Sequence, residues 1–171
     1  MQISKRIFSA GFTLTELMAV VIIISILAVL ATGSYRKAVE RTRLSDGLIA
    51  ASTVMESVNR YQAEKYPAAT AGYPKYNQLD ISFPNEKACT TASDYCKKTK
   101  YFEITIGNSG FVDAQRMKGA SAGDYTVRVY SDTFSATKGH ATECRAANDG
   151  GKDLCVSAGY GTCDSNRVCV K

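Results

Sequence analysis

The chain has 171 residues, of which 45% are hydrophobic and 22% are charged, and its formal net charge is +5. This length favours a single domain with enough chain to bury a core, and the abundance of apolar residues excludes an intrinsically disordered chain. The small positive charge argues against a dedicated nucleic-acid-binding protein, and a single histidine excludes metal sites built from several histidines.

The first predicted element is an apolar helix that is long enough to cross a membrane. The nineteen residues from Leu17 to Tyr35, here called the apolar segment, carry no charged side chain. As a helix they would span about 28 Å, close to the ~30 Å hydrocarbon core of a bilayer. Lys5 and Arg6 precede the segment, and the positive-inside bias keeps such residues in the cytoplasm. The alternative is an ordinary secretory signal peptide, removed so that the mature chain starts near Thr32.

Two features favour a retained helix over a signal peptide. Glu16 stands at the start of the apolar run. An ionised carboxylate in a membrane helix costs up to roughly 2.5–3.5 kcal/mol, the upper value applying near mid-membrane. A signal peptide that is removed would have no use for such a residue. The helical pattern also continues beyond the apolar segment and ends at or before Tyr66, because Pro67 follows. We therefore expect one nearly continuous helix of about fifty residues. Its second half has apolar residues on one face: Leu44, Leu48, Ala51, Met55, Val58 and Tyr61.

The start of the chain resembles a type IV prepilin. A basic pair is followed by Gly11, Phe12, a glutamate four residues later and then the apolar segment. In that family a prepilin peptidase removes a leader after the glycine and methylates the new N-terminal residue. The resemblance therefore implies a leader peptide over residues 1–11, cleavage between Gly11 and Phe12, and N-methylation of Phe12. It also implies a transmembrane and polymerisation helix over residues 12–35.

The resemblance gives Glu16 a role in filament assembly. A cationic amine on Phe12 and an anionic Glu16 are each costly in an apolar environment, and less so when they are paired. In pilin filaments the glutamate of one subunit pairs with the N-terminal amine of a neighbour, which would select the register of the subunits. The alternative is a glutamate near the membrane edge that has no partner.

The same resemblance names partners and a location. The implied partners are identical or related pilin subunits, the prepilin peptidase and a pilus assembly platform in the inner membrane. The subunit would cross the inner membrane once before assembly, with its N-terminus in the cytoplasm, and would then become extracellular in the pilus.

We expect the exported domain, residues 36–171, to have an α+β fold. The end of the long helix, residues 36–66, would pack on an antiparallel sheet, with residues 67–100 as a connecting loop. Residues 101–171 would form the sheet and a cysteine-rich tail. Alternating apolar residues predict strands at Tyr101–Ile106, Phe111–Arg116 and Tyr125–Tyr130, and more weakly at Phe134–Cys144 and Leu154–Ala158.

All six cysteines lie in the exported domain: Cys89, Cys96, Cys144, Cys155, Cys163 and Cys169. An even number of cysteines in an oxidising compartment indicates disulfides, and six allow 15 connectivities, among which the sequence does not choose. The connectivity that keeps the loops short, which is our hypothesis, pairs Cys89 with Cys96, Cys144 with Cys155 and Cys163 with Cys169. A structural zinc site is the alternative, although no CxxC motif supports it.

Other polar clusters give weaker signals. No nucleophile motif surrounds His140, so we expect no enzymatic activity, and nothing in the chain calls for a cofactor. The acidic stretch 148–153 does not match the spacing of an EF-hand and is typical of a solvated turn. Short lysine runs beside tyrosines occur at nucleic-acid sites but more often form solvated faces. The residues of this kind are Tyr95, Lys97, Lys98, Lys100 and Tyr101.

These observations predict a structural protein. The prediction is a type IV pilus subunit that polymerises through its N-terminal helix into a surface fibre serving adhesion, twitching motility or DNA uptake. The alternative is a pseudopilin of a type II secretion system, which shares the N-terminal motif; the six exported cysteines and the long tail favour the pilus. A third hypothesis is an exported binding domain or enzyme behind a conventional signal.

Overall fold

The computed structural model describes residues 11–65, 72–89, 93–132 and 141–171. The chain divides between Ala38 and Val39 into two compact units. The second of them, Val39–Lys171, is called the globular unit below. One helix, α1, begins in the first unit and ends in the globular unit.

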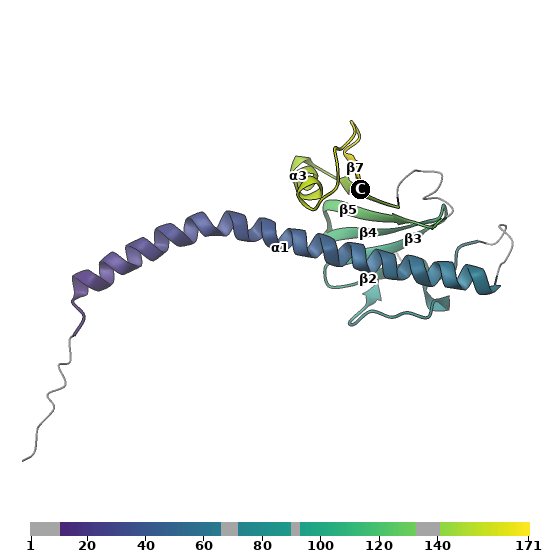
Figure 1. Cartoon of the computed structure of the whole chain (residues 1–171). Helices are drawn as coiled ribbons and strands as arrows, with labels where there is room; N and C mark the ends of the chain where they lie inside the picture. The colour runs from purple at the N-terminus through teal and green to yellow at the C-terminus, as the bar shows by residue number, and fades with distance from the viewer. Residues whose placement is uncertain (1–10, 66–71, 90–92, 133–140) are drawn as a thin grey trace, which may run out of the picture. The chain divides into compact units, whose positions relative to one another are not determined.

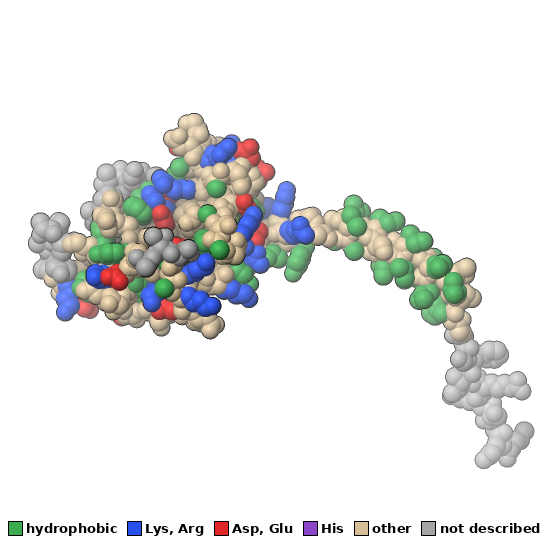
Figure 2. All heavy atoms as spheres, turned by 180° about the vertical axis from the view of Figure 1, so that it is seen from behind, with side chains coloured by type: hydrophobic (Ala, Val, Ile, Leu, Met, Phe, Trp, Pro, Cys, Tyr) green, Lys and Arg blue, Asp and Glu red, His purple; other side chains and the backbone are tan. Residues whose placement is uncertain are grey.

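The prediction of one long helix is confirmed. Helix α1 (Leu14–Lys65) has 52 residues (Figure 1), and the predicted stop at Pro67 lies outside the described residues. In the apolar segment every side chain is exposed, and Figure 2 shows apolar side chains on it. Helix α1 is long and apolar enough to cross a membrane. A helix that is apolar on all sides needs lipid or other protein around it.

The globular unit contains an antiparallel sheet. Within the described residues seven strands form it, and neighbours in the chain are neighbours in the sheet (Figure 1). The strands are β1 (Lys87–Ala88), β2 (Cys96–Lys98), β3 (Phe102–Gly107), β4 (Phe111–Lys118), β5 (Ser121–Tyr130), β6 (Thr142–Ala146) and β7 (Val168–Val170). A short 3₁₀ helix, η1 (Tyr76–Gln78), precedes β1, and helix α3 (Asp149–Ser157) lies between β6 and β7.

The core lies between α1 and one face of the sheet. The buried residues of α1 include four of the six predicted ones, Leu44, Ala51, Met55 and Val58, and three that the periodicity did not name, Gly47, Val54 and Ser57. Close approach of the two layers requires Gly47, because a Cβ there would lie 2.6 Å from the ring of Phe102 on β3. The predicted α+β fold, a helix packed on an antiparallel sheet, is confirmed.

Three local predictions were wrong. The connecting loop 67–100 contains β1, β2 and η1. The weak strand at Leu154–Ala158 and the solvated turn at 148–153 are instead largely helix α3. Asn148 explains the helix, because its side chain caps the first turn by accepting a hydrogen bond from the Gly151 backbone N–H at 2.8 Å. The other weak strand, Phe134–Cys144, lies mostly outside the described residues, and β6 begins at Thr142.

Candidate functional site

The N-terminus of α1 holds Glu16 in a reciprocal cap. One carboxylate oxygen of Glu16 accepts hydrogen bonds from the Thr13 backbone N–H at 2.9 Å and from the Thr13 hydroxyl at 2.8 Å. The Thr13 hydroxyl oxygen lies 3.2 Å from the Glu16 backbone N–H and accepts from it. Such a capping box satisfies donors that a helix start leaves free. It engages Oε2 of the carboxylate, and among the described residues Oε1 accepts no hydrogen bond.

The peptide bond between Gly11 and Phe12 lies just before this cap. Residues 11–13 have no regular secondary structure, and the side chain of Phe12 is 81% exposed. A protease must bind its substrate in an extended conformation, so a bond outside the helix is accessible without unfolding α1. The predicted cleavage site therefore lies just before α1, with Phe12 four residues before Glu16 in the chain.

Two hydroxyl groups of the apolar segment are hydrogen-bonded within the helix itself. The hydroxyl of Ser25 donates to the carbonyl oxygen of Val21 at 2.6 Å, and the hydroxyl of Thr32 donates to that of Ala28 at 2.8 Å. Both hydroxyls are thus satisfied by the preceding turn of their own helix, as is usual in lipid. Glu16 is consequently the costly group at the start of this helix.

In the globular unit an ion pair ties α1 to the sheet. The guanidinium of Arg116 on β4 donates to both carboxylate oxygens of Glu40, at 3.0 and 2.9 Å, and Arg43 donates to the same carboxylate. Arg116 is only 5% exposed. Its hydrogen bonds hold the pKa of Glu40 below the ordinary value. Sequence reasoning missed this pair, because Glu40 and Arg116 are 76 residues apart and no local pattern links them.

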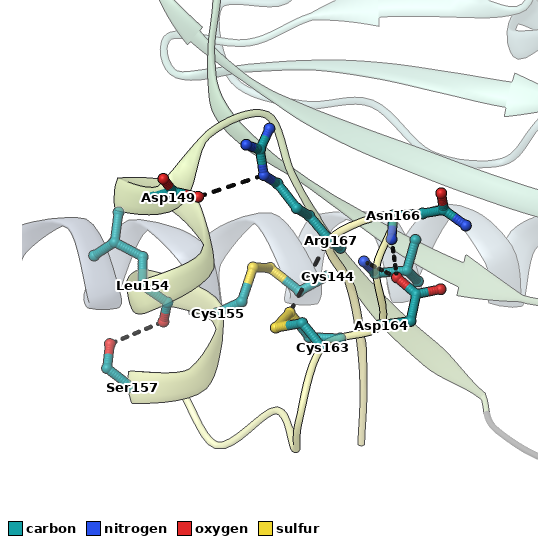
Figure 3. The surroundings of a disulfide bond; sticks show 11 residues. Cys144, Asp149, Leu154, Cys155, Ser157, Cys163, Asp164, Asn166 and Arg167 are labelled. Carbon is teal, nitrogen blue, oxygen red and sulfur yellow. Dashed lines mark hydrogen bonds and ion pairs between the residues drawn. A yellow bond between two sulfur atoms is a disulfide. The ribbon is translucent and has the colours of Figure 1, made fainter.

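The tail is a folded element held by two disulfides. Cys144 on β6 is bonded to Cys155 on α3, and Cys163 is bonded to Cys169 on β7 (Figure 3). Cys144 and Cys169 lie opposite each other in the β6–β7 ladder, so the two disulfides are neighbours. Between Cys163 and Cys169 a carboxylate oxygen of Asp164 accepts from the backbone N–H groups of residues 166 and 168 and closes the turn.

The remaining cysteines pair at the edge of the sheet. Cys89 is bonded to Cys96, and the described residues contain no free cysteine. All three bonds are the short-loop pairs named above. Glu103 lies within 4.8 Å of the sulfurs of Cys89 and Cys96, but sulfurs joined in a disulfide offer a metal no thiolate.

The lysines near β2 differ in whether they form an ion pair within the described residues. Lys97 forms an ion pair with Glu86 at 3.1 Å and is therefore occupied. Lys98 and Lys100 make no ion pair within the described residues, and the Lys100 ammonium lies 5.0 Å from the ring centroid of Tyr101. His140 lies outside the described residues.

Two curated proteins resemble the chain over most of its length. Both are named fimbrial protein, both come from Pseudomonas aeruginosa, and each is 30% identical to this chain over 140 residues. The matched region covers 82% of this chain and 80% of each relative. No protein-family model matches the chain, and no solved structure matches it significantly.

Proposed function

This chain belongs to the type IV pilin family and is a pilus subunit, and we propose that it is cleaved between Gly11 and Phe12 and polymerises through α1 into a surface fibre. One observation carries the proposal. An exposed, non-helical Gly11–Phe12 bond stands just before a helix that bears one carboxylate, Glu16, at its start and continues into the apolar segment, in which every side chain is exposed.

Cleavage would create a cationic partner for Glu16. The new N-terminus at Phe12 is a cationic amine, and N-methylation leaves it cationic. Thr13 stays in the mature chain, so the cap on one oxygen of Glu16 persists and lowers the cost of the carboxylate in lipid before assembly. The other oxygen would then accept the amine of a neighbouring subunit. Because an unpaired buried charge costs roughly 3–5 kcal/mol, subunits in the wrong register would be disfavoured.

The proposed divisions of the chain follow from this sequence of events. Residues 1–11 are the leader, residues 12–35 the transmembrane and polymerisation helix, and residues 36–171 the exported domain. The subunit crosses the inner membrane once with its N-terminus in the cytoplasm, where prepilin peptidase acts, and an assembly platform then moves it into the extracellular fibre. Its role is structural, and it catalyses no reaction.

The curated relatives favour a pilus over the pseudopilus of a type II secretion system, because both are named fimbrial protein. Recovery of the subunit in fibres sheared from the cell surface separates the two functions. A subunit found only in membranes would favour the pseudopilus.

The test replaces Glu16 by alanine in cells that lack the wild-type copy. Glu16→Ala is expected to leave the amount of subunit in membranes unchanged and to lower the amount in the sheared fraction by at least about tenfold, as loss of a charge pair of this cost requires. Glu64→Ala, at an exposed glutamate near the other end of α1, is the matched control and should assemble normally. Wild-type amounts of sheared Glu16→Ala fibre would refute the pairing.

A further inference from the structure

Three cations lie close to the ring of Tyr101, in the turn between β2 and β3. The guanidinium carbon of Arg43 lies 4.6 Å from the ring centroid of Tyr101, that of Arg116 lies 5.6 Å away, and the ammonium of Lys100 lies 5.0 Å away. We call Arg43, Lys100, Tyr101 and the nearby Lys98 the Tyr101 cluster. Figure 2 shows Lys and Arg side chains on the surface of the globular unit.

The charge at the Tyr101 cluster is not balanced. Arg43 and Arg116 share one carboxylate, that of Glu40, and Lys100 has no carboxylate partner among the described residues. Three cations against one anion leave two positive charges beside the ring. This excess of positive charge lowers the pKa of Tyr101. The causes are a hydrogen bond from Lys100 and the positive charges of Lys100 and Arg43.

Lys98 adds a further cation at the same end of the sheet. Among the described residues its ammonium donates to one backbone carbonyl, that of Gly119 at 3.3 Å in the turn between β4 and β5. Glu103 stands opposite Lys98 in the β2–β3 register but forms no ion pair with it within the described residues. Lys87 also pairs with Lys98 across the β1–β2 ladder, so this edge of the sheet carries more cations than anions.

The position of Arg43 in the chain, shortly after the apolar segment, indicates which ligand these cations bind. Arg43 follows Tyr35, the last residue of the apolar segment, by eight residues, which rise by about 12 Å in a helix. The polar headgroup layer beside the hydrocarbon core of a bilayer is roughly 5–8 Å thick. The side chain of Arg43 reaches back along the helix to Glu40, so its guanidinium comes within range of lipid phosphates, and tyrosines are enriched at that depth.

We propose that the Tyr101 cluster binds the anionic headgroups of the leaflet on the exported side while the subunit awaits assembly. This proposal rests on the membrane anchoring in the proposed function and adds a contact of the globular unit with lipid. The positive-inside bias disfavours cations on this side of a span, and anionic headgroups give them a partner there. Each Lys or Arg near an anionic surface strengthens binding by roughly fivefold.

The test uses the full-length chain in vesicles. The chain is reconstituted into vesicles of phosphatidylcholine alone and into vesicles that also contain phosphatidylglycerol, and lysines are acetylated with an amine-reactive reagent and quantified by peptide mass spectrometry. We expect acetylation of Lys98 and Lys100 to fall by roughly fivefold in the anionic vesicles and to recover at high salt. Lys75, which binds Asp94 before the start of β2, is the internal control and should not change.

Two variants test whether the protection of Lys100 depends on Arg43 itself or only on the net charge of the chain. Arg43→Gln is expected to restore much of the acetylation of Lys100 in anionic vesicles, whereas Lys75→Gln, an equal loss of charge, should leave the protection intact. Equal acetylation of Lys100 in both kinds of vesicle, with the chain floating with both, would overturn this proposal and leave the proposed function standing. A chain that floats with neither kind would overturn the membrane anchor and this proposal together.

Discussion

Replacement of Glu40 by glutamine is expected to destabilise the globular unit by stranding a buried cation. The side chain of Arg116 is 6% exposed and that of Glu40 is 23% exposed. Glu40→Gln keeps the shape of the side chain but removes the charge that Arg116 and Arg43 share. The remaining acceptors of Arg116, the carbonyl oxygens of Tyr101 and Met117, carry no net charge.

The expected loss follows from this burial. Removal of one partner from a fully buried ion pair costs about 3–5 kcal/mol, because the other charge stays desolvated. Glu40 is partly open to water, and solvent that enters its place recovers part of this cost. We therefore expect Glu40→Gln to lower the free energy of unfolding by about 2–3 kcal/mol. Adding Arg116→Met to Glu40→Gln should recover most of the loss, since no buried charge then remains.

The assay is denaturant unfolding of the full chain in detergent with its disulfides intact, followed by near-ultraviolet circular dichroism. Asp94→Asn is the matched control, because Asp94 pairs with Lys75 while its side chain is 64% exposed, and such surface pairs contribute at most about 1 kcal/mol. If Glu40→Gln unfolded within about 0.5 kcal/mol of the wild type, the argument that Arg116 depends on Glu40 would be wrong.

The pH dependence of the free energy of unfolding tests the Glu40–Arg116 ion pair independently. The hydrogen bonds of Arg116 lower the pKa of Glu40 in the folded chain. The resulting stability is present above the ordinary pKa of a glutamate and is lost as the pH falls through the lower folded pKa. Below an ordinary glutamate pKa of about 4.3, the wild type should lose stability with acid more steeply than Glu40→Gln. Parallel curves would contradict the assignment.

Three further changes test other parts of the account. Gly47→Val should lower the free energy of unfolding by about 1–3 kcal/mol by overpacking against Phe102; unchanged stability would show that the layers are further apart. Replacing Cys144 and Cys155 together by alanine should cost about 2–4 kcal/mol, and an unchanged unfolding midpoint would show that their disulfide does not restrain the tail. Gly11→Leu should leave uncleaved precursor in the membrane, detected by its larger mass; normal processing would exclude the proposed cleavage site.

The sequence predicts the helical part of the fold well, because its signals are local. Nineteen uncharged residues and an apolar residue every third or fourth position indicate one long helix, and α1 spans Leu14–Lys65. The three longest strands of alternating residues were also located, since β3, β4 and β5 overlap the predicted ranges. The close packing at Gly47 was not predicted, although a glycine in the middle of the apolar face of a helix often marks close packing.

The tail was harder to predict because short elements depend on tertiary contacts. Helix α3 has nine residues, and its apolar positions fit a short strand equally well. Asn148 before Asp149 was a usable capping signal, but it stood within an acidic stretch that is also typical of turns. Strands β1 and β2, of two and three residues, are too short for periodicity to reveal.

In the candidate site, too, local motifs were visible in the sequence and contacts between distant residues were not. The resemblance to prepilins implies roles for Gly11, Phe12 and Glu16, and these stay predictions; the structure adds the hydrogen bonds from Thr13 that hold the carboxylate. The contact between Glu40 and Arg116 joins distant parts of the chain, so only the folded structure reveals it.

The most direct test of the central claim is the mass of the subunit and of its N-terminal peptide, measured without reduction on fibres sheared from the cell surface. The account predicts a chain that starts at a methylated Phe12 and lacks six hydrogens, two for each of the three disulfides. A chain that starts near Thr32, or that retains residues 1–11, would contradict cleavage at Gly11 and assembly through α1.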